Sequence, residues 1–254
     1  MGLKNDERFT NKADIYRKYR PAYPKELIDY LYMHVGFTSE SIVADIGSGT
    51  GIFSLLLLKR GSKVYCVEPN EDMRQTAEKD LSTYKNFVSI SGNDENTGLQ
   101  ANSVDFVTAA QAFHWFNQQA FTSECRRILR FNGKVLLAWN IRDYEHEIIK
   151  RDYKIREEYC IDRKGLGEGG GPSKDCESLF KDSICECKIF RNDLIIDRET
   201  YIGMNLSRSY APNEENYPDK FHGFLNELGK LFDEYSVNGF LSYPHFTKSY
   251  VGRI

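Results

Sequence analysis

Short apolar runs alternate with amphipathic stretches between residues 41 and 140, and this alternation predicts strands joined by helices. We expect strands at 41–46, 63–68, 87–91, 104–110 and 133–139, and helices at 52–60, 70–84 and 117–130. Gly61 is expected to end the first of these helices and Asn70 to cap the second. Strands that are separated by helices pair in parallel through right-handed crossovers, so the expected fold class is α/β with an open, doubly wound sheet.

The alternation is weaker after residue 140, and we place no domain boundary there. Helices are expected at 144–161, 198–207 and 214–235, one or two strands within 184–196, and a final strand at 247–253. Five of the seven residues at 165–171 are glycine, and Pro172 follows them, so 165–172 is predicted to be a flexible loop. The second half of the chain is therefore interpreted as a cap on one sheet.

The charge balance limits the partners that the chain is expected to have. The 254 residues carry 34 basic and 37 acidic side chains, a formal net charge of −3, with none of the basic excess that nucleic-acid binding favours. Its longest apolar runs fall short of the roughly 20 residues that span a bilayer. We expect a cytoplasmic protein with a small-molecule substrate and no nucleic-acid or membrane partner; oligomeric state is not predicted.

Six cysteines are scattered along the chain, and we expect them to be reduced. Cys185 and Cys187 have no second Cys or His pair at a zinc-finger spacing, so they are interpreted as neighbours on one strand and no metal is expected.

A glycine-rich turn, 45–51 (DIGSGTG), joins the first strand to its helix. Glycines let the backbone turn tightly and approach a ligand, and the helix that follows offers unpaired N–H groups. A dinucleotide fingerprint would place its third glycine at position 52, which is Ile52, and no P-loop lysine follows. Asp45 would repel a pyrophosphate but suits a cationic amino group. A tight turn that binds nothing is the alternative.

Acidic and amide side chains follow the second and third strands. Glu68 ends the second strand, where a carboxylate can accept hydrogen bonds from both ribose hydroxyls of a nucleoside. Asn93, Asp94 and Glu95 follow the third strand, at a position suited to an adenine edge. A surface carboxylate and an ordinary polar loop are the alternative interpretations.

Taken together, these segments resemble the class I S-adenosylmethionine-dependent methyltransferases. The motifs that carry the resemblance are VADIGSGTG (43–51), VYCVEPN (64–70), SGNDEN (91–96), VDFVTAAQAFHWF (104–116) and RRILRFNGKVLLAWN (126–140). YRKYRPAYP (16–24), AQAFHWF (110–116) and LSRSYAP (206–212) are similar to the small-molecule subgroup called methyltransferase type 11, and within it to trans-aconitate methyltransferase-like proteins.

The resemblance implies S-adenosyl-L-methionine as cofactor and a Rossmann-like sheet of seven strands, the last one antiparallel. It divides the single domain 1–254 into an N-terminal helical cover (1–40), a cofactor-binding core (41–140), a cap or substrate region (141–245) and a final strand (246–254). The glycine turn would surround the methionine part, Glu68 would hold the ribose, and the third and fourth strand ends would lie beside adenine and the sulfonium. The implied cofactor-binding residues are Tyr19, Arg20, Asp45, Gly47, Ser48, Gly49, Glu68, Pro69, Asn93, Asp94, Glu95, Gln111, Ala112 and Phe113.

Methyl transfer from a sulfonium is an in-line displacement, for which the protein aligns the reactants and excludes water. A carboxylate acceptor needs no base, whereas a hydroxyl does, and His114 is the candidate base; a packed histidine is the alternative. The candidate substrate residues are Tyr16, Trp115, Arg208 and Tyr210. Residues 109–113 lack the Pro-Pro motif of methylation on nucleic-acid bases.

Two other functions stay open at this point. The first is a module that binds S-adenosylmethionine without catalysis. The second is a nicotinamide-dependent oxidoreductase, which the glycine spacing disfavours.

Overall fold

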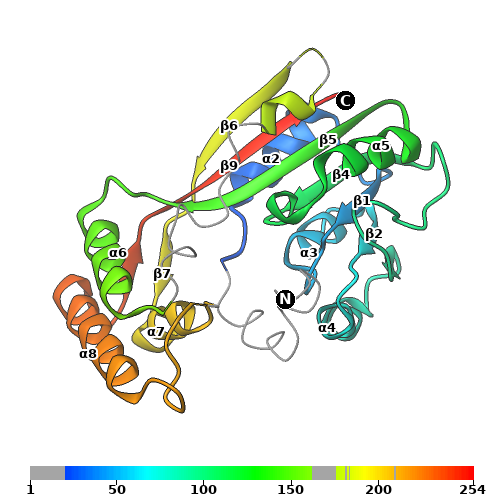
Figure 1. Ribbon diagram of the computed structural model, residues 1–254. Coiled ribbons are helices and arrows are strands. Elements are labelled where there is room, and N and C mark those ends of the chain that lie inside the picture. The colour runs from blue at the N-terminus through cyan, green and yellow to red at the C-terminus, as the bar shows by residue number, and fades with distance from the viewer. Residues whose placement is uncertain (1–20, 162–175, 181, 183, 209) are drawn as a thin grey trace.

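The computed structural model describes residues 21–161, 176–180, 182, 184–208 and 210–254, and a seven-stranded sheet lies at its centre (Figure 1). The strands are β1 (Ile42–Ile46), β2 (Lys63–Val67), β3 (Phe87–Ile90), β4 (Val104–Ala110), β5 (Leu129–Arg142), β6 (Cys185–Arg191) and β9 (His245–Gly252). Their order is β3-β2-β1-β4-β5-β9-β6, and β9 is antiparallel to both neighbours while the first five pair in parallel. The α/β class, the doubly wound sheet and the antiparallel last strand are therefore confirmed.

Helices cover both faces of this sheet because its central strands are apolar on both sides. One face packs against α2 (Lys25–Tyr30), which continues as a π-helical turn over Leu31–Val35, and against α3 (Ile52–Leu58) and α4 (Glu71–Leu81). The other face packs against α5 (Gln118–Ile128). Along β1, Val43 lies in the first core and Ala44 in the second, as the alternation of side chains across a strand requires.

The predicted helix boundaries next to the turns follow local hydrogen bonding. The Asn70 side chain accepts a hydrogen bond from the Met73 N–H at 3.0 Å, which confirms it as the N-cap of α4. Gly61 has a φ of +95°, a left-handed conformation that stops the helix before it. Helix α4 ends at Leu81, three residues before the predicted limit of 84.

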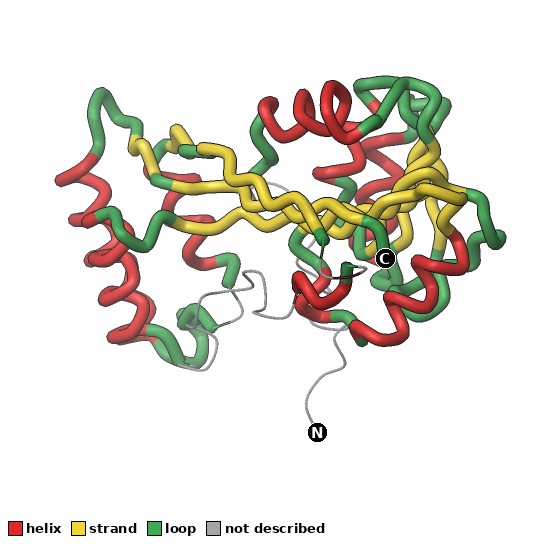
Figure 2. Tube along the Cα trace, turned by 90° about the horizontal axis from the view of Figure 1, so that it is seen from above, coloured by secondary structure: helices red, strands yellow, loops and turns green. Residues whose placement is uncertain are grey.

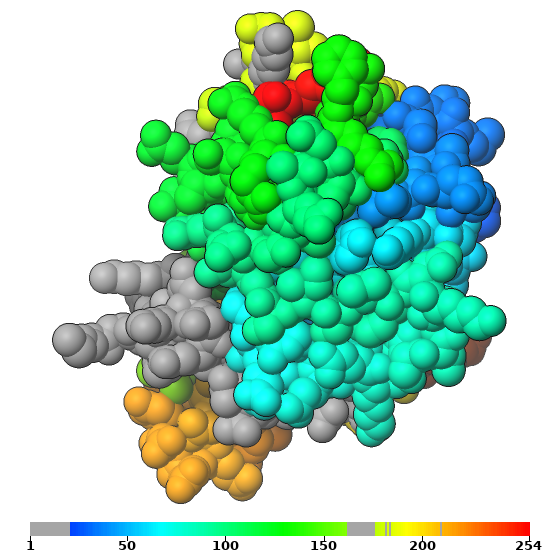
Figure 3. Space-filling view, turned by 90° about the vertical axis from the view of Figure 1, so that its right-hand side faces the viewer, coloured from blue at the N-terminus to red at the C-terminus, as the bar shows by residue number. Residues whose placement is uncertain are grey.

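A second lobe follows the sheet and has its own hydrophobic core. It consists of α6 (Glu147–Tyr159), α7 (Arg198–Leu206), α8 (Pro218–Tyr235) and a hairpin of β7 (Leu194–Ile196) and β8 (Leu241–Tyr243). β5 and β9 extend out of the main sheet into this lobe, which Figure 2 shows from above. Figure 3 shows part of this lobe in orange, where it projects beyond the main sheet and its helices, which are coloured blue to green. Within the described residues, no helix is both long and apolar enough to cross a bilayer.

Three expectations for the second half of the chain need correction. β5 covers 14 residues instead of the predicted seven, because it already begins at Leu129, which pairs with Val104 of β4, and antiparallel pairing with β9 continues it to Arg142. β8 was not predicted, because three residues with one exposed side chain give no pattern of their own. β6 lies within 141–245 but is the edge strand of the main sheet and no part of a cap. The predicted loop at 165–172 lies outside the described residues. Helices α6, α7 and α8 lie within their predicted ranges.

Candidate functional site

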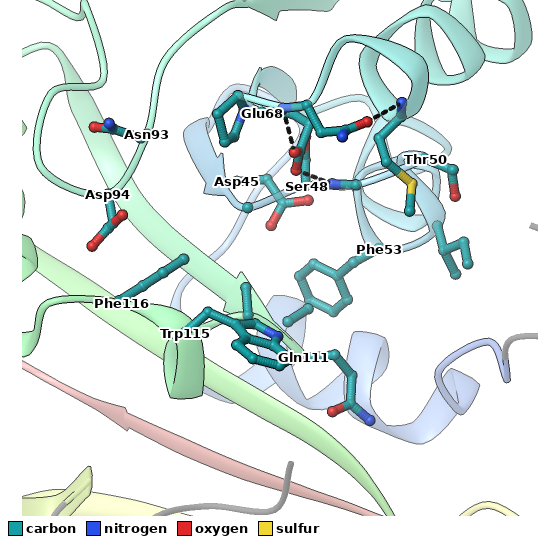
Figure 4. A pocket seen from close by; sticks show the side chains of 18 of the residues that line it. Asp45, Ser48, Thr50, Phe53, Glu68, Asn93, Asp94, Gln111, Trp115 and Phe116 are labelled. Carbon is teal, nitrogen blue, oxygen red and sulfur yellow. Dashed lines mark hydrogen bonds between the residues drawn. The ribbon is translucent and has the colours of Figure 1, made fainter. Parts of the chain in front are cut away.

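A cavity of about 410 Å³ opens at the carboxyl ends of the parallel strands, beside the glycine turn (Figure 4). Ligands on doubly wound sheets bind at this edge. Most of the predicted cofactor residues and one candidate substrate residue line it: Asp45, Gly47, Ser48, Gly49, Glu68, Pro69, Asn93, Asp94, Glu95, Gln111, Ala112 and Trp115. The fold therefore brings together residues that are up to 70 positions apart in the chain.

The glycine turn is held in a conformation that other residues rarely adopt. Gly47 and Gly49 have φ values of +67° and +56°. A Cβ atom on Gly47 would lie 2.7 Å from the Ala112 Cβ, too close for any real contact, whereas a Cβ on Gly49 would meet nothing within 4 Å. The Gly47 N–H also donates to the Val67 carbonyl at 2.9 Å. Gly47 thus brings the ends of β1 and β4 together, while Gly49 leaves room for a ligand.

Glu68 connects the end of β2 to the glycine turn. Its Oε2 atom accepts a hydrogen bond from the Gly49 N–H and its Oε1 atom accepts one from the Asn70 N–H, each at 2.9 Å. Burial raises the pKa of this carboxyl, and the two backbone N–H groups oppose the shift. Each carboxylate oxygen has two lone pairs, so both retain one for a ligand hydroxyl.

Asp45 is the most deeply buried carboxylate in the cavity wall, with 1% of its surface exposed. Among the described residues its partners are two neutral hydroxyls, because Oδ1 accepts from Thr108 at 2.7 Å and Oδ2 accepts from Ser54. Burial raises its pKa to about 6, and these hydroxyls only partly oppose the shift. A buried carboxylate without a cationic partner is suited to a cationic ligand group.

The ends of β3 and β4 supply the remaining polar wall. Asp94 accepts a hydrogen bond from the Asn117 N–H at 2.9 Å, and burial raises the pKa of its carboxyl. Gln111 has a φ of +57°, unusual for a residue other than glycine, and donates from Nε2 to the Asn140 carbonyl at 2.9 Å. In Figure 4, Asn93 and Asp94 lie apart from the Asp45, Ser48 and Glu68 side chains that gather at the turn.

Several predicted site residues do not line the cavity. Phe113 is buried and packs edge-on against Phe121 and Trp139. His114 accepts the Trp139 indole N–H on Nδ1 at 3.4 Å, the nitrogen that a neutral imidazole would use to take a proton. Two of the candidate substrate residues, Arg208 and Tyr210, lie in the second lobe, with the guanidinium 5.9 Å from the phenol ring centre. The remaining three, Tyr16, Tyr19 and Arg20, fall outside the described residues.

The cavity also contains residues beyond the predicted cofactor and substrate residues. They are mostly aromatic, aliphatic or amide side chains: Pro21, Tyr23, Thr50, Ile52, Phe53, Asn70, Met73, Ala110, Phe116, Asn117 and Asn140. Asn140 has the most connections, since its Nδ2 donates to the Pro21 carbonyl at 3.1 Å and its Oδ1 accepts from Thr247. The only sequence signal for Asn140 was its place at the carboxyl end of a predicted strand.

Comparisons with known proteins agree with this geometry. A family model described as "Methyltransferase domain" matches residues 44–137. A methyltransferase-like protein of Schizosaccharomyces pombe is 31% identical over 235 residues, covering 87% of this chain and 86% of that protein. An uncharacterised methyltransferase of Mycobacterium tuberculosis is 36% identical over 135 residues, 53% of each chain, so the match spans about half the length of that relative. A structure assigned as a type II methyltransferase from Anaeromyxobacter dehalogenans has a TM-score of 0.62 at 21% identity, covering 92% of this chain and 98% of its own.

Proposed function

Because the chain belongs to the class I S-adenosylmethionine-dependent methyltransferases, we propose that it transfers the methyl group of S-adenosyl-L-methionine to a small-molecule acceptor. The acceptor atom is a carboxylate or hydroxyl oxygen, and the reaction is an in-line displacement. The trans-aconitate-like subgroup stays a prediction from the sequence motifs.

The observation that carries this proposal is the pair of buried carboxylates on either side of the glycine turn. The cofactor combines a nucleoside with an ammonium group, and Glu68 and Asp45 match these two parts in charge and hydrogen-bonding capacity. A pyrophosphate at the turn would instead be repelled by the Asp45 carboxylate. The space above Gly49, where a Cβ would meet no atom of the described residues within 4 Å, supports close approach of a ligand.

When bound, the cofactor supplies a methyl group that its positive sulfur already activates for displacement. The chain's own residues bind and orient: Glu68 accepts the ribose hydroxyls, Asp45 accepts the ammonium, and Asp94 and Asn93 accept or donate at the adenine edge. Trp115 and Phe116 form an apolar wall that excludes water from the reacting atoms. Such orientation is worth up to roughly 7–11 kcal/mol in favourable cases.

A hydroxyl acceptor must lose a proton to a base during the reaction, whereas an ionised carboxylate has none to lose. The proposed base, His114, is outside the described cavity wall, and its Nδ1 atom is hydrogen-bonded to Trp139. A carboxylate acceptor is ionised at neutral pH and needs no base, so we favour it over a hydroxyl.

The test is release of S-adenosylhomocysteine when the purified protein is incubated with S-adenosylmethionine and a panel of metabolites that includes acids, alcohols and amines. Turnover of at least one acceptor is expected. Tight cofactor binding without turnover of any acceptor would favour a non-catalytic binding module. Saturable binding of NADH without binding of S-adenosylhomocysteine would refute the proposal. No nucleic-acid partner is proposed, because the net charge of −3 lacks the basic excess that such binding favours. The proposed setting is the cytoplasm, without a membrane partner.

A further inference from the structure

The second lobe contains a cluster of charged and phenolic side chains that are almost completely removed from solvent. Asp152 on α6 is its centre, and it accepts hydrogen bonds from the Tyr201 hydroxyl at 2.9 Å and the Tyr243 hydroxyl at 2.8 Å. Arg156, one turn further along α6, forms an ion pair with the same carboxylate at 2.9 Å. Arg142, at the end of β5, donates from Nε to the Tyr243 hydroxyl at 3.1 Å. None of these five side chains is more than 8% exposed.

The charges of this cluster do not balance within the described residues. Arg142 and Arg156 carry two positive charges, since guanidinium groups stay protonated in proteins, and Asp152 supplies one negative charge. His245 adds none, because burial and then the charge of Arg142 lower its pKa to about 3. The acidic side chains next to it, Asp143 and Asp193, are occupied by ion pairs with Arg191 at 3.1 and 2.7 Å. Within the part of the chain that the structure describes, one buried positive charge is therefore left without a counter-charge, and an approaching anion would supply it.

Two guanidinium atoms in the same part of the lobe have no hydrogen-bond partner among the described residues although water cannot reach them. They are the Nη2 atom of Arg156, in a side chain that is only 1% exposed, and the Nε atom of Arg208. Tyr210 connects the two, since it lies beside the Arg208 guanidinium and close enough to Arg156 to interact with it electrostatically. Buried donors are almost always satisfied, so two unsatisfied guanidinium donors indicate a missing acceptor.

The cluster lies next to the cavity along β5. Asn140 lines the cavity, and Arg142 follows two residues later on the same face of the strand, roughly 7 Å away. Both residues pair with β9, Asn140 opposite Thr247 and Arg142 opposite His245. None of the three arginines is among the described residues that line the cavity, but a molecule that extends from the glycine turn past Asn140 would point its far end toward Arg142.

We propose that Arg142, Arg156 and Arg208 bind an oxyanion, a carboxylate or phosphate, of the methyl acceptor. This inference rests on the proposed methyl transfer and defines its substrate class as a small acid. The planar guanidinium fork suits two oxygens of one anionic group, and it would fix the end of the acceptor that does not react.

The experiment measures binding to the full chain saturated with S-adenosylhomocysteine, by calorimetry and by thermal unfolding. The probes are short straight-chain dicarboxylates, the uncharged diamides of the same lengths, and inorganic phosphate. We expect at least one anionic probe to bind and to raise the unfolding temperature, and its uncharged counterpart not to do so. Stronger binding of dicarboxylate than of phosphate would identify a carboxylate, and the reverse would identify a phosphate.

Two variants separate this site from general attraction by positive charge. Arg208→Gln leaves the Asp152 contacts intact and should weaken binding of the anionic probe tenfold or more. Arg151→Gln removes an exposed arginine of α6 that pairs with Glu234, and should leave the affinity unchanged. Equal effects of both variants, equal binding of acids and diamides, or no anion binding up to about 1 mM would each overturn the inference. Failure of S-adenosylhomocysteine itself to bind would instead refute the proposed function.

Discussion

The raised pKa of Asp45 predicts how the affinity for the cofactor product depends on pH. In the free protein this pKa is about 6, because the carboxylate is buried against two hydroxyls. If the ammonium group of S-adenosylhomocysteine pairs with it, the pKa returns toward its ordinary value of 3.8, about two units lower, which is worth up to ~3 kcal/mol. Binding then favours the ionised carboxylate, so the affinity is full above pH 6 and decreases as the pH falls through 6. The expected loss is about tenfold between pH 7 and pH 5.

The assay is isothermal titration calorimetry of S-adenosylhomocysteine at a series of pH values, with adenosine as the matched ligand. Adenosine lacks the ammonium but retains the ribose and adenine, so it reports on Glu68 and Asp94, whose pKa values are also raised by burial. The difference in pH dependence between the affinities for the two ligands therefore reports on Asp45. The Asp45→Asn variant should lose this difference in pH dependence, and its affinity at pH 7 should fall toward that of the wild type at pH 5.

Two results would refute this reasoning. One is an S-adenosylhomocysteine affinity whose pH dependence is the same as that of adenosine. The other is an Asp45→Asn variant that keeps the tenfold loss between pH 7 and pH 5, because the titrating group would then lie elsewhere.

Three further substitutions test the remaining parts of the site. Glu68→Ala should weaken S-adenosylhomocysteine binding tenfold or more in calorimetry and also lower the unfolding temperature, since two backbone N–H groups lose their acceptor; unchanged affinity would contradict the ribose role. Gly47→Ala should destabilise the free protein by about 1–3 kcal/mol more than Gly49→Ala in denaturant unfolding, because both place alanine at a positive φ but only the Cβ at position 47 would collide with Ala112; Gly49→Ala should also lower affinity, and equal stability losses would argue against this distinction. His114→Ala should leave turnover within a few-fold, as its ring lies outside the described cavity wall, and loss of turnover at unchanged cofactor affinity would establish it as the base.

The core of the fold was predictable because its strands and helices carry their own patterns. β1 and β4 are apolar on both faces, and Asn70 and Gly61 act through bonds within a few residues of themselves. β8 was missed because its stability comes from pairing with β7, which is distant in the chain. The length of β5 was missed for a similar reason, since its partner β9 lies more than 100 residues further on.

The site was predictable where chemistry and strand ends coincide. The carboxylates Asp45, Glu68 and Asp94 are polar side chains at the ends of apolar strands, and the structure places all three in the cavity wall. Phe53 was missed because an aromatic residue on the buried face of a helix has the same pattern whether it lines a cavity or fills a core. His114 was predicted as a site residue but does not line the cavity, because a short 3₁₀ turn over Phe113–Trp115 directs consecutive side chains to different surroundings.

β5 and β9 pair without a break up to Arg142 and His245, where the second lobe begins. A hinge usually requires a loop that absorbs changes in φ and ψ, and the loops that join these strands to the second lobe, 143–146 and Pro244, lie beyond Arg142. Any rotation before that point would have to twist a ladder of backbone hydrogen bonds. The distance from the glycine turn to Arg142 is therefore fixed by β5, and we expect it to favour acceptors of one length over shorter or longer analogues of the same charge.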